Sequence, residues 1–412
     1  MAPTQISSST EAAMYNPFTA EAFLGLLLLF SSLNNTSASE TTYLLTAIPT
    51  LTILLFYTLL RRPLPDLVVS KFAFTLIMII WGSYFISFII PPVEVSEFMR
   101  IFPFFVANLC VIFWIPNVIN AKSFIRQLSV VSCVLTLIGL PTAVLGAYSV
   151  GPLQISGVGE SFSLFQGVEL WIVSSIFDNQ NIFSMIAALG SVSSLGAYIF
   201  TRKMLYQLST ILCLIGLFLA QGRASILASI LGIGIILVHQ VAGAKQFRQV
   251  VALGAVTSLI TTFCVLWIFP IEHLVSAIEL SGREYLWPAG VKAIINNPIF
   301  GIGIDSTSGA IAPYLSETLI GSGVHNTYLY IFLTAGIVGG TAYLLLVSQM
   351  GLTALLRINS SEGITIFALF AGLLTIQMFS SSPFFGFSVR PIVTGLTFGY
   401  LLQMCCLTEQ PQ

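Results

Sequence analysis

The chain has 412 residues, of which 56% are hydrophobic and only 8% are charged, and its formal net charge is −1 at pH 7. So little charge excludes a soluble globular protein of this length, which needs a charged surface. A near-neutral chain without a basic tail gives no indication of nucleic-acid binding. Repeated apolar runs of about 17–25 residues are typical of helices that span a bilayer. Because these runs lack the alternation of barrel strands, we expect an all-α polytopic integral membrane protein.

Twelve apolar runs are candidates for transmembrane helices, and we expect them to form a single membrane domain over residues 1–412. The first run is short and is also compatible with a position at the membrane surface. In chain order the runs are 18–33, 43–60, 67–90, 101–119, 128–149, 182–200, 204–220, 224–241, 249–269, 326–347, 363–380 and 391–407.

The charged residues predict an orientation with both termini in the cytoplasm. The cytoplasmic side then holds ten of the fifteen basic residues, counting Lys71 just inside the third run, as the positive-inside rule expects, whereas most acids fall outside. The inner basic residues are Arg61, Arg62, Lys71, Lys122, Arg126, Arg202, Lys203, Lys245, Arg248 and Arg357. The outer acids are Glu40, Glu94, Glu97, Glu160, Glu169, Asp178, Glu272, Glu279, Glu284, Asp305 and Glu317.

Five basic residues depart from this pattern and lie on the predicted outer face. They are Arg100, Arg223, Arg283, Lys292 and Arg390. One explanation is structural, with a long side chain at a helix end that reaches the interface and pairs with an outer acid. We favour it for Arg100, which stands near two glutamates. For the others an interaction with an anionic ligand is the alternative hypothesis.

The longest polar interruption is the predicted outer loop 270–325, which carries Arg283. Ser281 and Glu284 have the spacing of a capping box, which predicts that Arg283 lies in the first turn of a short helix. Free amides at a helix N-terminus attract anions, and an arginine strengthens that attraction. The structural alternative is a surface ion pair between Arg283 and a neighbouring glutamate, which contributes little.

Two further residues give this short helix its expected limits and contacts. Pro288 either kinks the helix or stands at its first position, and Asn297-Pro298 ends it. Trp287 follows Arg283 by four residues, so its ring could stack on the guanidinium or on a sugar ring.

Arg223 and His325 are the other candidate site residues. Arg223 follows Gln221-Gly222 in a minimal break between two apolar runs, where a partly desolvated guanidinium attracts phosphate. His325 directly precedes the run 326–347, and an imidazole can accept a proton near neutral pH. Each could instead cap a helix or rest at the interface.

Two arginines and a histidine at one face form a coherent chemical set. The arginines can neutralise a pyrophosphate leaving group, and the histidine can deprotonate an attacking hydroxyl. No histidines or acids show metal-ligand spacing on one helix face, and the six cysteines fall within apolar runs. We therefore expect neither a metal site nor disulfides, and no cofactor.

Several motifs between about residues 160 and 347 resemble the region shared by O-antigen ligases and O-antigen polymerases. The motifs are Ile176-Phe177-Asp178-Asn179-Gln180-Asn181, Gln221-Gly222-Arg223-Ala224-Ser225, Gly282-Arg283-Glu284 with Trp287, Asn297-Pro298-Ile299-Phe300-Gly301-Ile302-Gly303, His325-Asn326-Thr327-Tyr328 and Gly336-Ile337-Val338-Gly339.

The resemblance implies a GT-C-like membrane glycosyltransferase that works without metal at the periplasmic face of the bacterial inner membrane. Such enzymes take a glycan from undecaprenyl pyrophosphate and attach it, with inversion, to a sugar of the lipid A-core (ligases) or to another glycan (polymerases). By the same resemblance, Arg223 and Arg283 bind the pyrophosphate and His325 activates the acceptor. Asn326 supports them, and Trp287, Lys292 and Arg390 are further candidates for substrate binding.

Ligase-type transfer is the leading hypothesis, with a repeat-unit polymerase of the same family as the closest alternative. A secondary transporter is the alternative from another class. Transporters usually place ionisable groups near the bilayer midplane and show repeated halves. In this sequence the centres of the predicted spans carry almost no charge and the exceptions gather at one face, which favours interfacial chemistry.

Overall fold

The structure is a computed structural model that describes residues 17–34, 36–37, 40–61, 70–89, 95–151, 153–157, 161–165, 168–268, 282–304, 307–381 and 385–407. Helices dominate this part of the chain, and it divides into two compact units. The first unit comprises Met1–Val68, Ala107–Gly222 and Phe387–Tyr400, and the second comprises Val69–Val106, Arg223–Gly386 and Leu401–Gln412.

Within the described residues, five helical segments are long and apolar enough to cross a membrane. These are Ile101–Val118, Ala121–Leu145, Gln180–Thr201, Arg223–Gly254 and Thr327–Arg357. Shorter apolar helices cover Thr19–Ser31, Leu45–Leu60, Lys71–Ser87, Met204–Ala220 and Ser361–Gln377. The prediction of a helical membrane protein is confirmed at this level. The count of twelve spans and their orientation stay predictions.

The helices of the first unit pack closely because small residues line their contacts. Gly190 on α8 shows this best, since a Cβ there would lie 2.3 Å from the Cβ of Ser132 on α6. The hydroxyls of Ser129 and Ser194 also meet at 2.6 Å between the same helices. Small side chains let helix backbones approach where lipid gives no hydrophobic driving force. The unit holds α1 (Pro17–Ser31), α2 (Glu40–Arg61), η2 (Cys110–Trp114), α5 (Ile115–Val118), α6 (Ala121–Gly139), α7 (Thr142–Leu145), α8 (Gln180–Thr201), α9 (Met204–Ala220) and the start of α16 (Val389–Leu407).

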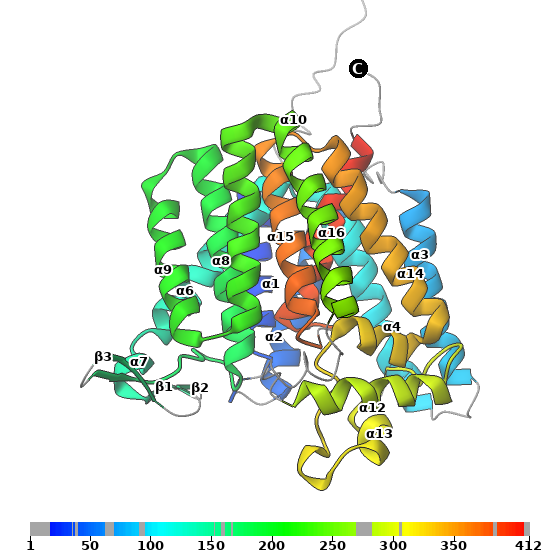
Figure 1. The fold of residues 1–412 in the computed structure, drawn as a ribbon. Helices are drawn as coiled ribbons and strands as arrows, with labels where there is room; N and C mark the ends of the chain where they lie inside the picture. The colour runs from blue at the N-terminus through cyan, green and yellow to red at the C-terminus, as the bar shows by residue number, and fades with distance from the viewer. Residues whose placement is uncertain are drawn as a thin grey trace, which may run out of the picture. The chain divides into compact units, whose positions relative to one another are not determined.

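Two small antiparallel hairpins stand in the first unit between α7 and α8. β1 (Ala147–Val150) pairs with β2 (Leu153–Ser156), and β3 (Phe162–Phe165) pairs with β4 (Val168–Leu170) (Figure 1). Strands of three or four residues are too short to show an alternating pattern, so the all-α prediction missed them.

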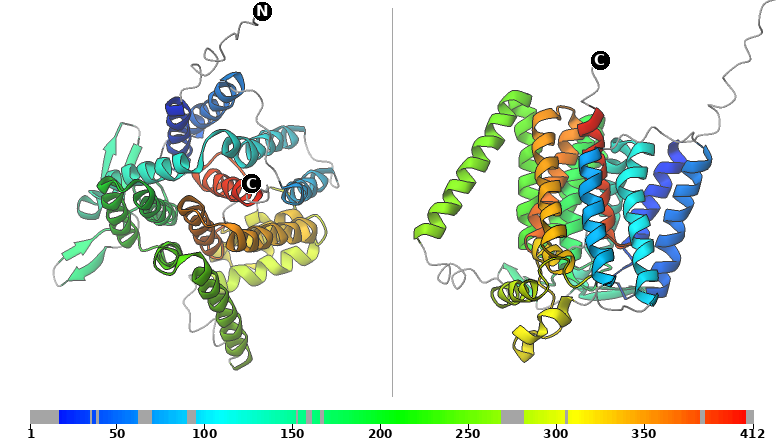
Figure 2. Two further views of the ribbon diagram at one scale, coloured as in Figure 1. Left: turned by 90° about the horizontal axis from the view of Figure 1, so that it is seen from above. Right: turned by 90° about the vertical axis from the view of Figure 1, so that its right-hand side faces the viewer.

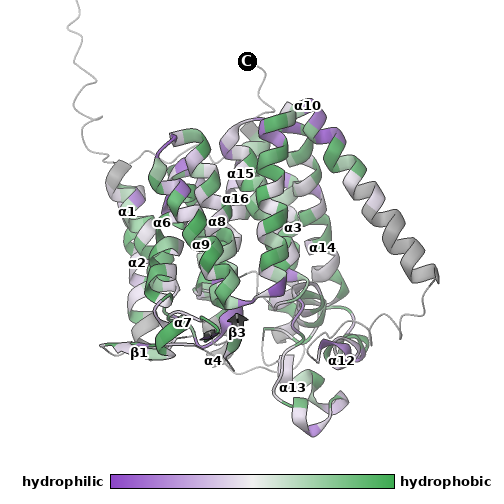
Figure 3. Ribbon diagram, turned by 60° about the vertical axis from the view of Figure 1, so that its left-hand side comes forward, coloured by the Kyte–Doolittle hydropathy of each residue, from purple (hydrophilic) through white to green (hydrophobic). Residues whose placement is uncertain are grey.

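The second unit places a short helix crosswise at the ends of its long helices. Figures 1 and 2 show α12 (Arg283–Asn296) lying crosswise at the end of α14 (Thr327–Arg357). The same unit contains α10 (Arg223–Ile268) and α15 (Ser361–Gln377). In Figure 3 α12 carries both purple and green residues, whereas the first part of α10 is mostly green. The remaining elements are α3 (Lys71–Ile89), most of α4 (Val95–Leu109), α13 (Thr307–Ile311), η3 (Ala312–Tyr314) and η4 (Glu317–Leu319).

Glycines break two of these long helices. Gly243 has φ 71° and divides α10 into two helices, in the gap between the predicted runs 224–241 and 249–269. Gly336 has φ 65° and divides α14 in the same way. A left-handed residue inside an apolar helix leaves backbone groups that need new partners, because lipid offers none.

The loop after α12 supplies those partners for α14. On one side of the break, Ile302 and Gly303 donate their N–H groups to the carbonyls of Leu333 and Thr334, at 3.0 and 2.9 Å. On the other side, Ile337 and Val338 donate to Pro298 and Ile299, at 2.8 and 3.3 Å. The approach is so close that only glycine fits at the two crossing points: a Cβ on Gly301 or Gly336 would lie 2.5 or 2.1 Å from backbone atoms. The loop that ends α12 is thereby locked into α14.

Candidate functional site

Three helices of the second unit begin at the predicted site residues. Arg223 is the first residue of α10, Arg283 is the first residue of α12, and Asn326 is the N-cap of α14, directly after His325. The first amides of a helix have no partner within the helix and carry the positive end of its dipole. Helix starts of this kind are suited to an anionic group.

The turn after α15 connects two of these helix starts. Three successive carbonyls of this turn, those of Met378, Phe379 and Ser380, each accept a hydrogen bond. The donors are the side-chain amide of Asn326 at 3.0 Å, the Nη2 of Arg283 at 3.0 Å and the hydroxyl of Thr327 at 2.7 Å. Because all the bonds converge on one turn, the start of α12 and the start of α14 are held together by backbone acceptors.

Arg223 lies close enough to Arg283 to change its electrostatics. Partial burial lowers the pKa of Arg283 most, the positive charge of Arg223 lowers this pKa further, and Glu284 acts in the opposite direction. Two guanidinium groups that repel one another at the starts of two helices form a region of positive potential. An anion that bridges them would relieve the repulsion.

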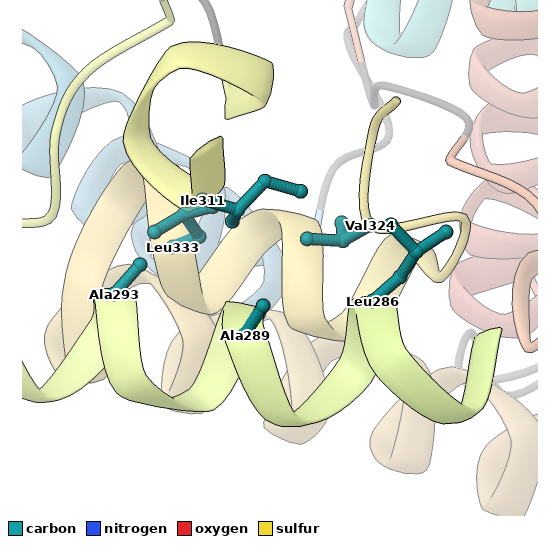
Figure 4. Packing of buried hydrophobic residues seen from close by; sticks show 6 residues of the cluster. All are labelled: Leu286, Ala289, Ala293, Ile311, Val324 and Leu333. Carbon is teal, nitrogen blue, oxygen red and sulfur yellow. The ribbon is translucent and has the colours of Figure 1, made fainter. Parts of the chain in front are cut away.

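His325 adopts a backbone conformation that is uncommon for a residue with a Cβ. Its φ is 47°, in the left-handed region, where histidine is tolerated better than most side chains. The preceding Val324 is fully buried in a cluster with Leu286 of α12 (Figure 4). A Cβ on Gly290 of α12 would lie 3.0 Å from Val324 Cγ1. The helix that carries Arg283 therefore also anchors the segment that presents the exposed His325.

Asn326 has two structural roles in this arrangement. Its side-chain oxygen accepts the N–H of Leu329 at 3.0 Å and caps α14, while its amide nitrogen donates to Met378. The amide side chain satisfies both requirements at once, because it contains an acceptor and a donor.

The structure corrects one prediction about the start of α12 and decides between two alternatives for Pro288. The N-cap of α12 is Gly282, with φ 87° and no side-chain cap, and Ser281 of the expected capping box lies outside the described residues. Pro288 lies inside α12 and not at its first position. Before α10, Gln221 has a left-handed backbone, with φ 54°. The expected first-turn position of Arg283 and the end of α12 before Asn297 are confirmed.

The other candidate residues differ in their surroundings. Trp287 packs its ring against Phe379, with centroids 6.4 Å apart, and its buried Nε1 has no hydrogen-bond partner within the described chain. Lys292 is exposed on α12 and lines a cleft with Tyr314. Arg390 belongs to the first unit, at the second residue of α16. Among the described residues, no group of three or more His, Cys, Asp or Glu side chains is placed to hold a metal ion.

Sequence reasoning missed the acceptor turn at residues 378–380 and the part played by Thr327. Backbone carbonyls give no signal in a sequence, because every residue has one. Thr327 stood within a noted motif, but its role depends on a turn about 50 residues later in the chain.

Comparison with known proteins agrees with the motif analysis. Residues 208–344 match the family model described as O-antigen ligase, which confirms the resemblance over that range and indicates a glycosyltransferase-type activity in a membrane protein. No curated protein matches the chain. Among solved structures, a chain from "Structural coordination of polymerization and crosslinking by a peptidoglycan synthase complex" shares 16% sequence identity at a TM-score of 0.40, and the alignment covers 83% of this chain and 99% of that chain.

Proposed function

From the membership of residues 208–344 in the O-antigen ligase family, we propose that the protein transfers a glycan from undecaprenyl pyrophosphate to a sugar hydroxyl of a lipid A-core acceptor. The reaction takes place at the periplasmic face of the inner membrane, inverts the anomeric carbon and needs no metal. The observation that carries the proposal is the convergence of two helix-start arginines with the segment that holds His325 and Asn326. It supplies positive potential and a proton acceptor in one region.

In the proposed reaction the imidazole of His325 removes the proton from the acceptor hydroxyl. The resulting oxygen attacks the anomeric carbon, and the bond between that carbon and the pyrophosphate oxygen breaks. The bonding electrons leave with the carrier pyrophosphate, whose new negative charge is stabilised by Arg223 and Arg283. This stabilisation increases as the charge develops, and such differential binding is what lowers a barrier.

The hydrogen bond from Arg283 to Phe379 supports this role. It fixes the orientation of a side chain that has five N–H donors, and the planar guanidinium matches phosphate oxygens in pairs. Asn326 acts through position: it fastens the start of α14, and hence the residue before it, to the same turn.

The direct test uses purified protein with an undecaprenyl pyrophosphate-linked glycan and a lipid A-core acceptor, in the presence of a chelator. We expect an intact glycan on the acceptor, and no product with Arg223→Ala, Arg283→Ala or His325→Ala while each variant still inserts into the membrane. Wild-type rates in all three variants would refute the mechanism.

The same assay separates the alternatives. A polymerase would lengthen the carrier-linked glycan stepwise and yield a ladder, whereas a ligase moves the glycan intact. A secondary transporter would yield no covalent product with either acceptor. It would instead move its solute across sealed vesicles.

A further inference from the structure

A cleft of about 680 Å³ lies between α12 and the segment that contains η3 and η4. Its walls include Glu284, Tyr285 and Lys292 from the helix, and Tyr314 and Leu319 from the facing segment. This volume falls in the range of pockets that bind small organic ligands. None of the chemistry assigned to Arg223 or His325 uses this cleft.

The wall that faces α12 is held in place by a buried cluster. Ala289 and Ala293 of α12 belong to the same buried cluster as Ile311 and Val324 (Figure 4). Ile311 precedes the facing segment and Val324 follows it, so both ends of that segment are held against α12. The hydroxyl of Tyr314 also accepts a hydrogen bond from the side-chain amide of Asn296 on α12. The cleft is therefore formed by packed elements before any ligand binds.

Two aromatic rings and an unsatisfied carboxylate give the cleft its chemistry. Tyr285 is 64% exposed, so its ring is available to a ligand, and Tyr314 contributes the second ring. The Oε2 atom of Glu284 is buried without a hydrogen-bond partner in the described part of the chain. Glu284 itself lines the cleft, and a carboxylate accepts hydrogen bonds from a ligand that can donate them.

These features together match a sugar ring. One face of a pyranose carries C–H groups, which pack against an aromatic ring, while its rim carries hydroxyls, which donate to a carboxylate and accept from an ammonium. Glu284 and Lys292 supply the acceptor and the donor at different points along the cleft.

The cleft lies next to the proposed pyrophosphate-binding site. Gly282 and Glu284 line it and flank Arg283 in the chain, so the cleft begins at the end of α12 where the pyrophosphate is proposed to bind. It extends to Lys292, which follows Arg283 by nine residues, or about 13 Å along the helix. That length exceeds one sugar ring.

We infer that this cleft binds sugar rings of the glycan substrate and thereby positions the glycan next to Arg283. The placement of the glycan next to Arg283 rests on the proposed function. The binding of sugar rings in the cleft does not depend on it. The ligand class is a pyranose oligosaccharide, whose source is either the donor glycan or the acceptor core.

Binding of free oligosaccharides tests the inference without any transfer reaction. The probes are the repeat-unit oligosaccharide released from its carrier and the core oligosaccharide released from lipid A, each followed by saturation-transfer NMR on the full-length protein in detergent. We expect one of the two to bind the wild type and to lose about tenfold in affinity with Tyr285→Ala or Glu284→Gln. The probe that binds identifies the source.

Ile295→Ala is the matched control, because Ile295 is 68% exposed on the same helix and does not line the cleft. It should bind as the wild type does. His325→Asn should bind normally as well, because it changes the proposed chemistry and leaves the cleft intact.

The outcomes separate the two proposals. If both cleft variants bind and transfer glycan as well as Ile295→Ala does, the cleft assignment is wrong and the proposed reaction stands. If the wild type transfers nothing but Tyr285→Ala still loses oligosaccharide binding, the cleft assignment stands and the proposed reaction is wrong. Failure of both probes to bind the wild type would overturn the cleft assignment.

Discussion

Two arginines of this protein, Arg126 and Arg283, differ in the groups that surround their positive charges. Arg126 on α6 donates to both carboxylate oxygens of Glu21 on α1, at 3.0 and 3.1 Å. Arg283 at the start of α12 donates to a backbone carbonyl and experiences the repulsive field of Arg223. The charge of Arg126 is thus opposed by a carboxylate, whereas Arg283 stands in the field of a second cation as well as in that of Glu284.

The comparison separates structural charge from functional charge. A cation that meets a carboxylate stabilises the fold, although a partly exposed pair contributes little. Two cations placed together at helix starts repel one another, and this arrangement motivates the proposal that an anionic ligand binds there.

Arg283→Lys should reduce glycan transfer by about 10³-fold or more, because an ammonium cannot reproduce the paired donors of a guanidinium that stabilises a leaving phosphate. Single-turnover rates with saturating carrier-linked glycan measure this loss. The matched control is Arg126→Lys, which keeps a cation opposite Glu21 and should transfer glycan within about twofold of the wild type. Equal losses of transfer rate in the two variants would contradict the proposed difference between Arg283 and Arg126.

His325→Asn should reduce the transfer rate by about 10²–10⁴-fold, because the amide cannot act as a general base. Asparagine tolerates the left-handed backbone at this position, so the thermal unfolding midpoint should stay close to that of the wild type. His325→Ala should lose the same activity and some stability in addition. Retention of the full rate by the asparagine variant would rule out the proton-transfer role.

Gly336→Ala should destabilise the second unit by more than about 3 kcal/mol. The new Cβ would lie 2.1 Å from the carbonyl oxygen of Ile299, at a residue with φ 65°. Unfolding in detergent measures the change. Gly351→Ala on the same helix is the control, since its nearest neighbour is a Phe370 atom at 3.6 Å, and it should be neutral or stabilising by about 0.5–1 kcal/mol. Similar results for both would show that the loop is not locked into α14.

Thr327→Val should destabilise the start of α14 by about 1–2 kcal/mol, because the fully buried hydroxyl donates to Ser380 at 2.7 Å and valine has nearly the same shape. Hydrogen exchange at the first amides of α14 should increase. We expect the transfer rate to fall as well, since the neighbouring His325 loses part of its anchorage. Unchanged exchange would contradict the role of the acceptor turn.

Glu21→Gln should lower the free energy of unfolding by at most about 1 kcal/mol, because the ion pair with Arg126 is partly exposed. The side chain of Glu21 is 20% exposed and that of Arg126 is 36% exposed. Glycan transfer should remain at the wild-type rate, because this ion pair belongs to the first unit and takes no part in the proposed chemistry. A large loss of transfer would show that the ion pair also serves function.

The sequence was most informative where hydrophobic length or backbone chemistry decides the structure. Apolar runs predicted helices because only intrahelical bonds satisfy a backbone in lipid. The gap between two runs contains Gly243, where α10 breaks, and Asn297-Pro298 follows the last residue of α12.

It was least informative where backbone groups meet over long distances in the chain. The motifs around Gly301 and Gly336 were noticed separately, but their interlocking depends on hydrogen bonds between main-chain atoms. The carbonyls of residues 378–380 are invisible for the same reason. The hairpins between residues 147 and 170 are too short for a periodic signal.

The central claim is that Arg223 and Arg283 jointly bind a pyrophosphate. Its most direct test is the thermal unfolding midpoint of the full chain with and without undecaprenyl pyrophosphate, for the wild type, Arg223→Gln, Arg283→Gln and the control Arg126→Gln. We predict that the ligand raises the midpoint of the wild type and of Arg126→Gln, as binding to the folded state must, and leaves both site variants unchanged. An equal ligand-induced rise in all four proteins would contradict the account.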